Sequence, residues 1–331
     1  MGGARTQRSS RFRRWAGRAL AALVLLMALA ALVERRCEQR DRELYASHET
    51  FADLASGAHV QYRLMGAGQP GPTIVLLNGF SATLEQWDPT QTALARVSPV
   101  LSYDAGGTGY STGSHAHDAW DQAEELAQLL DALHVGEPIV LVGYSASGSA
   151  ARVFAARYPA RVAGLFLLVP YMPELDALYS ERRGELAWLG RTSLSATVQT
   201  LFGLRRAALS LGLSHFGARP PATEVEQRGL AIFLYFPSWL AADRQLLKAS
   251  ASAKQGIAAH FSAPLVVMRS DENDVPHYAD FIDQFTAEHH GELRVQSGLH
   301  SELLRDPRSV ASVAQSISEL ASRVRSAPRV P

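Results

Sequence analysis

The sequence predicts an α/β protein with a doubly wound, mostly parallel sheet, a helical cap insertion and an N-terminal transmembrane helix. Short apolar runs alternate with amphipathic stretches over most of the chain, as strands joined by helices do. Residues 171–262 instead keep a helical periodicity without a strong strand, and residues 15–33 are almost entirely apolar. With 331 residues, 47% of them hydrophobic, the chain is long enough for a large core and an insertion.

The N-terminus has the pattern of a membrane segment. Six arginines precede 15 uninterrupted apolar residues, 19–33. We expect a basic cytoplasmic segment over 1–14, a transmembrane anchor over 15–33 and a charged stalk or leading helix over 34–58. The alternative is a cleaved signal peptide and a secreted protein. Because the small residues around Ala28 and Ala30 lie inside the apolar run with no polar region before them, an uncleaved anchor is favoured.

The remaining chain divides into a core, residues 59–170 and 263–331, and the helical cap between them. Ligands of such sheets bind at the carboxyl ends of the strands, so we expect a site there. The apolar stretch 230–240 either packs the cap onto the core or walls the site with apolar surface. Strands are expected at 59–65, 73–77, 100–103, 139–142, 164–169, 265–268 and 292–295, and helices at 118–133, 147–157 and 307–323.

Charge and cysteine content exclude some kinds of partner and some kinds of site. The 32 basic and 32 acidic residues cancel, so no global field attracts nucleic acid, and no nucleic-acid partner is expected. The single cysteine, Cys37, cannot form an intrachain disulfide or a cysteine metal site.

Ser145 lies where an apolar, β-branched run meets a helix-compatible stretch. Gly143 precedes it, and the small residues Ser147 and Gly148 follow. A sharp turn between strand and helix exposes a serine hydroxyl above the sheet edge, close to a helix N-terminus that stabilises negative charge. This context predicts a nucleophile.

Four segments resemble motifs of the α/β-hydrolase family. Residues 143–147 resemble the nucleophile elbow Gly-x-Ser-x-Gly, with Ser147 in place of the second glycine. Residues 78–80 resemble a His-Gly-Phe motif with Asn78 in place of histidine, and residues 104–111 resemble Asp-x-x-Gly-x-Gly-x-Ser. The loop around His300 resembles the family's histidine loop, in which glycine precedes histidine and an acidic-Pro helix start follows, here Asp306 and Pro307.

The resemblance implies a Ser-His-Asp triad. Ser145 would be the nucleophile and His300 the base, with the acid in the turn after residues 265–268. Asn273 takes the usual acid position without a gap, and a shift of one residue gives Asp274, which we prefer over Asp271. Glu174 and Asp176, after the earlier strand, are the remaining alternatives.

The backbone N–H groups of Phe80 and Ala146 would form the oxyanion hole. Chemistry of this kind needs no metal or organic cofactor. The expected activity is hydrolysis of an ester or related acyl bond in a small apolar acyl substrate, in a periplasmic or extracellular domain held by the membrane helix. Acyltransferase, perhydrolase or carbon–carbon hydrolase chemistry on the same triad remains open, as does a catalytically weak ligand-binding protein of the same fold.

Overall fold

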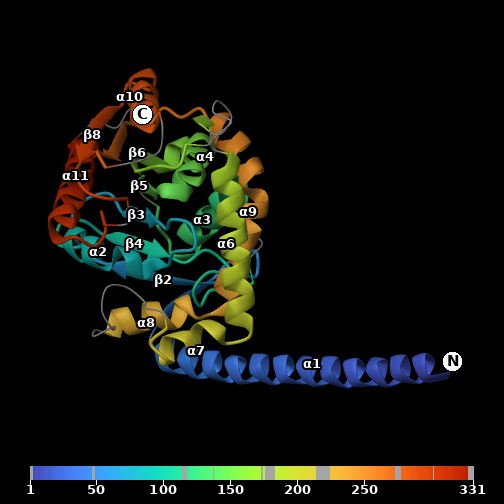
Figure 1. Ribbon diagram of the computed structural model, residues 1–331. Helices are drawn as coiled ribbons and strands as arrows, with labels where there is room; N and C mark the ends of the chain where they lie inside the picture. The colour runs from blue at the N-terminus through green and yellow to red at the C-terminus, as the bar shows by residue number, and fades with distance from the viewer. Residues whose placement is uncertain are drawn as a thin grey trace. The chain divides into compact units, whose positions relative to one another are not determined.

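The computed structural model describes residues 3–46, 49–113, 118–136, 138–172, 174–175, 183–213, 224–272, 277–300 and 302–326. Within these residues, eight strands form one sheet in the order β1-β2-β4-β3-β5-β6-β7-β8 (Figure 1). The pairs β1–β2 and β2–β4 are antiparallel and the other neighbours are parallel, which confirms the predicted mostly parallel sheet. The strands are β1 (Thr50–Asp53), β2 (His59–Met65), β3 (Ile74–Leu77), β4 (Val100–Tyr103), β5 (Ile139–Tyr144), β6 (Val162–Leu168), β7 (Leu265–Ser270) and β8 (Glu292–Gln296).

Helices cover both faces of the sheet. On one face Ile74 and Leu76 of β3 pack with α2 (Asp88–Leu94) and α11 (Pro307–Ser326). On the other face Val75 and Leu77 pack with α3 (Ala119–Ala132), α4 (Gly148–Arg157) and α10 (Tyr278–Glu288). All residues of β3 and β5 are buried, which explains why these strands are apolar without alternation. Three short 3₁₀ helices complete this part, η2 (Leu84–Trp87), η3 (Ser145–Ser147) and η4 (Pro159–Arg161).

In the described residues between β6 and β7, where the helical insertion was expected, the structure has four helices of seven residues or more. They are α6 (Arg183–Leu201), α7 (Leu204–Ser210), α8 (Glu224–Phe233) and α9 (Phe236–Ile257). In the part of the insertion that the structure describes, no strand occurs.

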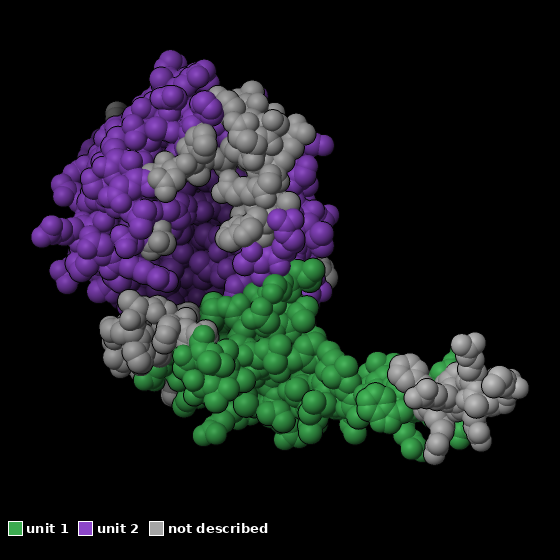
Figure 2. All heavy atoms as spheres, in the orientation of Figure 1, with its two compact units in different colours: residues 1–47, 194–236 green, residues 48–193, 237–331 purple. Residues whose placement is uncertain are grey.

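The chain forms two compact units (Figure 2). Unit 1 contains Met1–Ser47 and Leu194–Phe236, and unit 2 contains His48–Ser193 and Pro237–Pro331. Unit 2 therefore holds the whole sheet and its covering helices. Unit 1 combines the N-terminal helix with part of the insertion.

The N-terminal helix α1 (Gly3–Tyr45) is continuous. Among the described residues it is the one helix, over Arg13–Tyr45, with the length and apolar composition to cross a membrane, and none of its most apolar window is buried. The charged residues after position 33 continue the helix to Tyr45. The sheet begins at Thr50, so β1 lies inside the segment 34–58 that we expected to be a stalk.

Candidate active site

Ser145 stands at a strained turn between β5 and α4. Its φ of 54° places it in the left-handed region, which a residue with a side chain rarely adopts. The chain leaves β5 at Tyr144, makes the 3₁₀ turn η3 and enters α4 at Gly148. Strain of this kind persists only where the surroundings hold it, and it is common at functional sites.

Close packing around the turn requires small residues. A Cβ at Gly143 would lie 2.9 Å from the Cβ of Ala151 and 3.2 Å from the Cα of Gly148. Ser147, in place of the expected second glycine, is buried and its hydroxyl oxygen accepts a hydrogen bond from the Tyr144 N–H at 3.0 Å. The same hydroxyl lies within hydrogen-bonding distance of the carbonyl oxygens of Leu77 and Tyr144. Serine at this position therefore ties the turn to β3 as well as to β5.

His300 approaches from the loop after β8 and lines the same cavity as Ser145. The Tyr144 hydroxyl donates a hydrogen bond to the His300 carbonyl oxygen at 3.0 Å, and the two rings lie 5.2 Å apart. Burial raises the pKa of Tyr144 to about 12, so this hydroxyl keeps its proton. Burial also lowers the pKa of His300 from its ordinary value of 6.5, which favours the neutral imidazole that a base requires.

Four carboxylates were expected as possible partners of His300. Asp274 and Asp176 lie outside the described residues. Asp271 is exposed and accepts a hydrogen bond from the Ser297 hydroxyl at 2.7 Å. Glu174 forms an ion pair with the buried Arg152 at 2.8 Å. The contacts of Asp271 and Glu174 are thus structural ones, and the assignment of Asp274 stays a prediction.

The loop after β3 also lines the cavity. Phe80 and Ala146, the two expected oxyanion-hole residues, both border the cavity. Asn78 anchors this loop, because its amide donates to the carbonyl oxygen of Tyr103 and to the carboxyl of Asp104, both at 2.9 Å. Gly79 fits only as glycine, since a Cβ there would lie 2.9 Å from the Tyr144 ring.

Asp104 also holds this loop in place through its carboxyl group. One carboxyl oxygen accepts from the Leu84 N–H at 2.7 Å and from Asn78, while Gly109 packs so closely that a Cβ would overlap the other oxygen. Complete burial, together with the neighbouring Glu85, raises the pKa of Asp104 well above its usual range.

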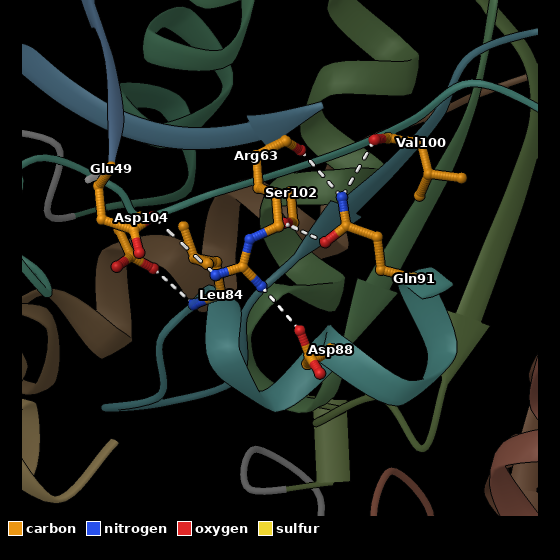
Figure 3. A network of polar contacts seen from close by, with 8 residues as sticks. All are labelled: Glu49, Arg63, Leu84, Asp88, Gln91, Val100, Ser102 and Asp104. Atoms are coloured by element: carbon orange, nitrogen blue, oxygen red, sulfur yellow. Dashed lines mark hydrogen bonds and ion pairs between the residues drawn. The ribbon is translucent and has the colours of Figure 1, made fainter. Parts of the chain in front are cut away.

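A further set of polar contacts joins β2, β4 and α2 (Figure 3). Arg63 forms an ion pair with Asp88 at 3.1 Å, and Gln91 donates to the backbone carbonyls of Arg63 and Val100. The Ser102 hydroxyl in turn donates to the Gln91 side chain at 2.8 Å. These contacts fasten α2 to β2 and β4.

The cavity has a volume of about 460 Å³ and a mostly apolar lining. Helix α9 supplies Leu246, Ala249 and Ala253, and the segment after β6 supplies Tyr171 and Met172. Among the described residues, no group of three or more His, Cys, Asp or Glu side chains is arranged to hold a metal ion.

The motifs and the sheet order agree with a match to a known protein family. The alpha/beta hydrolase fold family matches residues 72–304, which include Asn78, Ser145 and His300. The chain belongs to the α/β-hydrolase fold family. The predicted family resemblance is therefore confirmed.

Other α/β-hydrolase relatives are similar over part of their length. The human monoacylglycerol lipase ABHD6 is 33% identical over 131 residues, which are 38% of this chain and 36% of the relative. The 1-acylglycerol-3-phosphate O-acyltransferase ABHD5 of Rattus norvegicus is 30% identical over 148 residues, 43% of this chain and 42% of the relative. The chain thus spans less than half the length of these curated relatives.

Solved structures share the α/β-hydrolase fold over more of the chain. Cfl2 from Burkholderia cenocepacia superimposes with a TM-score of 0.65 at 22% sequence identity, covering 82% of this chain and 95% of that one.

Three residues have structural roles in this hydrolase-fold site that the sequence did not predict. Tyr144 contacts His300 although 156 positions separate them. Ser270 donates to the Gly298 carbonyl oxygen and accepts from the Glu272 N–H, which joins the turn after β7 to the histidine loop. Asp104 was recognised only as part of a glycine motif. Long-range contacts of this kind have no local sequence signal.

Proposed function

We propose that the protein is a serine hydrolase that cleaves an ester or related acyl bond through an acyl-enzyme on Ser145. The observation that carries the proposal is that Ser145, at a strained strand-to-helix turn, and His300 line one mostly apolar cavity. A nucleophile and a base that line one apolar pocket fit acyl transfer better than passive binding. The monoacylglycerol lipase named among the relatives supports the reaction class.

The mechanism follows the ordinary steps of a catalytic triad. His300 takes the proton of the Ser145 hydroxyl while the oxygen attacks the substrate carbonyl carbon. The negative charge of the tetrahedral intermediate is stabilised by the backbone N–H groups of Phe80 and Ala146. The bond to the leaving alcohol breaks as His300 returns the proton to it. Water then attacks the acyl-enzyme, again with His300 as base and Asp274 orienting the imidazole. The acyl–oxygen bond to Ser145 breaks as His300 returns the proton to the serine oxygen, which releases the carboxylic acid.

The helical insertion acts as the cap of this site. Leu246, Ala249 and Ala253 of α9 form an apolar wall of the cavity, which suits an acyl chain better than a charged ligand. Helix α1 anchors the protein in the membrane, since residues 19–33 are apolar without interruption and none of the most apolar window is buried. A substrate with an apolar acyl chain is consistent with both features.

The decisive experiment compares two serines of the same cavity. Ser145→Ala should lower hydrolysis of a short p-nitrophenyl ester by about 10³-fold or more, because both chemical steps use this oxygen. It should also abolish labelling by a fluorophosphonate. Ser149→Ala, a change to a serine of the same cavity four positions along, should retain fluorophosphonate labelling, because the label bonds to Ser145. A Ser145→Ala protein with nearly full activity would falsify the assignment, and a folded wild-type protein that is never labelled would favour a ligand-binding function.

Acyl transfer to an alcohol is a second candidate, favoured by the relative that is named an acyltransferase. The same acyl-enzyme would then react with an alcohol rather than with water. Adding glycerol derivatives during ester turnover and measuring the acylated product separates the two reactions.

A further inference from the structure

Three polar side chains in the cavity of unit 2 have no hydrogen-bond partner. Gln122 of α3, Gln245 of α9 and Thr108 of the loop after β4 all line this cavity. The two glutamines are half-buried and Thr108 is buried, and in the part of the chain that the structure describes none of these side chains makes a hydrogen bond. When a ligand displaces water from an apolar pocket, an unpaired polar group there costs free energy. The three side chains therefore indicate a ligand that supplies polar groups of its own.

Helix α9 contacts the rest of unit 2 at two places on either side of Gln245. Near the start of the helix, Ala241 lies beside Gly107, where a Cβ would be 3.6 Å from the Ala241 Cβ. Further along, the Ser252 hydroxyl accepts a hydrogen bond from the Ala119 N–H at 3.1 Å, at the N-terminus of α3. Gln245 is four positions after Ala241 and seven before Ser252, so it lies on the same face of α9, between the two contacts.

Thr108 and Gln122 lie close to these two contacts. Thr108 directly follows Gly107, and Gln122 is three positions after Ala119, one turn into α3. Because Cα–Cβ bonds tilt toward the N-terminus of a helix, the Gln122 side chain extends toward the end of α3 that Ser252 covers. Polar side chains from three elements therefore gather along one stretch of α9.

Helix α9 also presents apolar residues to the cavity. Leu246, Ala249 and Ala253 line it at a spacing of three and four positions, which places them in one row. Successive residues of a helix are about 100° apart around the axis, so Leu246 lies beside Gln245 and not behind it. The cavity thus has an apolar surface next to a polar one, and the acid and the alcohol of an ester can occupy different surfaces.

The polar surface consists of uncharged groups. A glutamine amide and a threonine hydroxyl each donate and accept hydrogen bonds. Among the described residues that line the cavity, none is Asp, Glu, Lys or Arg. A carboxylate or phosphate bound there would lose its hydration without gaining an ion pair. A hydroxyl group donates and accepts, so it pairs with an amide in either orientation, and the surface fits neutral hydroxyl groups best.

We propose that Gln122, Gln245 and Thr108 bind the free hydroxyl groups of the leaving alcohol, so that the substrate is an ester of an apolar acid with a neutral polyol. The acyl chain takes the apolar row of α9, which leaves the polar surface to the alcohol. This proposal rests on the proposed acyl-enzyme on Ser145, and it names the substrate class of that site.

The experiment compares two butyrate esters that differ only in the hydroxyls of the alcohol, with the full-length protein in detergent micelles. The wild type should hydrolyse glycerol monobutyrate, acylated at a terminal oxygen, with a kcat/KM about 10-fold or more above that of propyl butyrate, because each neutral hydrogen bond contributes a factor of about 2–10. Gln122→Leu, Gln245→Leu and Thr108→Val should each lower this ratio by about 2–10-fold. Gln315→Leu is the matched control, since Gln315 is an exposed glutamine of α11 that pairs with Glu319, and it should leave the ratio unchanged.

The outcomes separate this proposal from the acyl-enzyme. Equal kcat/KM for the two esters, or equal losses on both esters in the three variants, would overturn the polyol assignment and leave the acyl-enzyme intact. Propyl β-hydroxybutyrate carries its hydroxyl on the acid instead. A preference for it over propyl butyrate that Gln245→Leu removes would place the hydroxyl site on the acid and overturn the assignment to the alcohol.

Fluorophosphonate labelling of every protein checks that the turn around Ser145 is folded. A labelled wild-type protein that hydrolyses neither ester would overturn the polyol proposal alone. A folded wild-type protein that hydrolyses neither ester and is not labelled would overturn the acyl-enzyme as well.

Discussion

His300 and Ser145 each depend on a neighbour that the chain brings from elsewhere. The imidazole of His300 packs beside the Tyr144 ring, and Tyr144 is also the last residue before the strained Ser145. One tyrosine therefore supports both the nucleophile turn and the histidine loop. A change at Tyr144 would disturb both groups that we propose react, although it touches neither bond that is made or broken.

The pH dependence of the reaction follows from the burial of His300. Burial lowers the pKa of this imidazole below 6.5, and the base must be neutral. Activity should therefore be lost as the pH falls through the lowered pKa, and the acid limb of kcat/KM should lie below 6.5. The pH profile with a soluble ester measures this. An acid limb above 6.5 would contradict the proposed environment of His300.

The lowered pKa of His300 also makes the stability of the folded protein decrease as the pH falls. Since the imidazole binds a proton more weakly in the folded chain than in the unfolded one, protonation favours unfolding. This destabilisation is absent well above the unfolded pKa and grows as the pH falls from there to the lowered folded pKa. Replacing His300 with Gln should reduce the loss of stability over this window, as measured by denaturant unfolding at several pH values.

The choice of the triad acid is testable by two matched substitutions. Asp274→Asn should lower kcat far more than Asp271→Asn, because Asp271 already accepts the Ser297 hydroxyl and is exposed. Steady-state kinetics on the two variants decide between them. A larger loss from Asp271→Asn would reverse the choice, and little loss from either would point to Glu174 or Asp176.

At the scale of elements, the nucleophile turn depends on how closely β5 and α4 cross. Gly143→Ala places a methyl group 2.9 Å from the Cβ of Ala151, so it should destabilise the protein by about 1–3 kcal/mol and lower activity. Gly190→Ala, in α6, meets no atom within 4 Å and should be neutral or stabilising by up to about 1 kcal/mol. Unfolding midpoints of the two variants check this, and equal midpoints would contradict the close crossing.

Most strands could be predicted because burial on both faces gives them uninterrupted apolar residues. The bounds expected for β2 and β4 agree with the structure. Strand β5 runs slightly further than expected, to Tyr144. Strand β1 was missed because it is a four-residue edge strand in which only Ala52 is buried, so it has little apolar pattern. Helix α10 was missed because His277 precedes it in a left-handed conformation without a capping side chain.

At the scale of the whole molecule, α1 contacts part of the insertion, and the sequence does not predict these contacts. Glu34 and Glu38 of α1 are buried in unit 1, where Arg206 and the backbone N–H of Phe236 satisfy them. From the sequence, these carboxylates looked like a solvated stalk. Their partners are about 170–200 positions away, in a region whose helical pattern does not specify what it packs against. The N-terminal helix and residues Leu194–Phe236 of the insertion therefore belong to one unit.

The orientation of the anchor is the prediction that concerns the whole chain. Six arginines precede the apolar run and Arg35, Arg36, Arg40 and Arg42 follow it, so the bias of positive charge favours a cytoplasmic N-terminus. Both compact units beyond residue 33 then lie outside the cytoplasm. Protease added to intact spheroplasts should digest the catalytic part, and carbonate washing should leave the protein in the membrane fraction. Release by carbonate would favour cleavage of the segment 15–33. A catalytic part that is protected until the membrane is permeabilised would contradict the orientation, and adding arginines after Val33 should invert it.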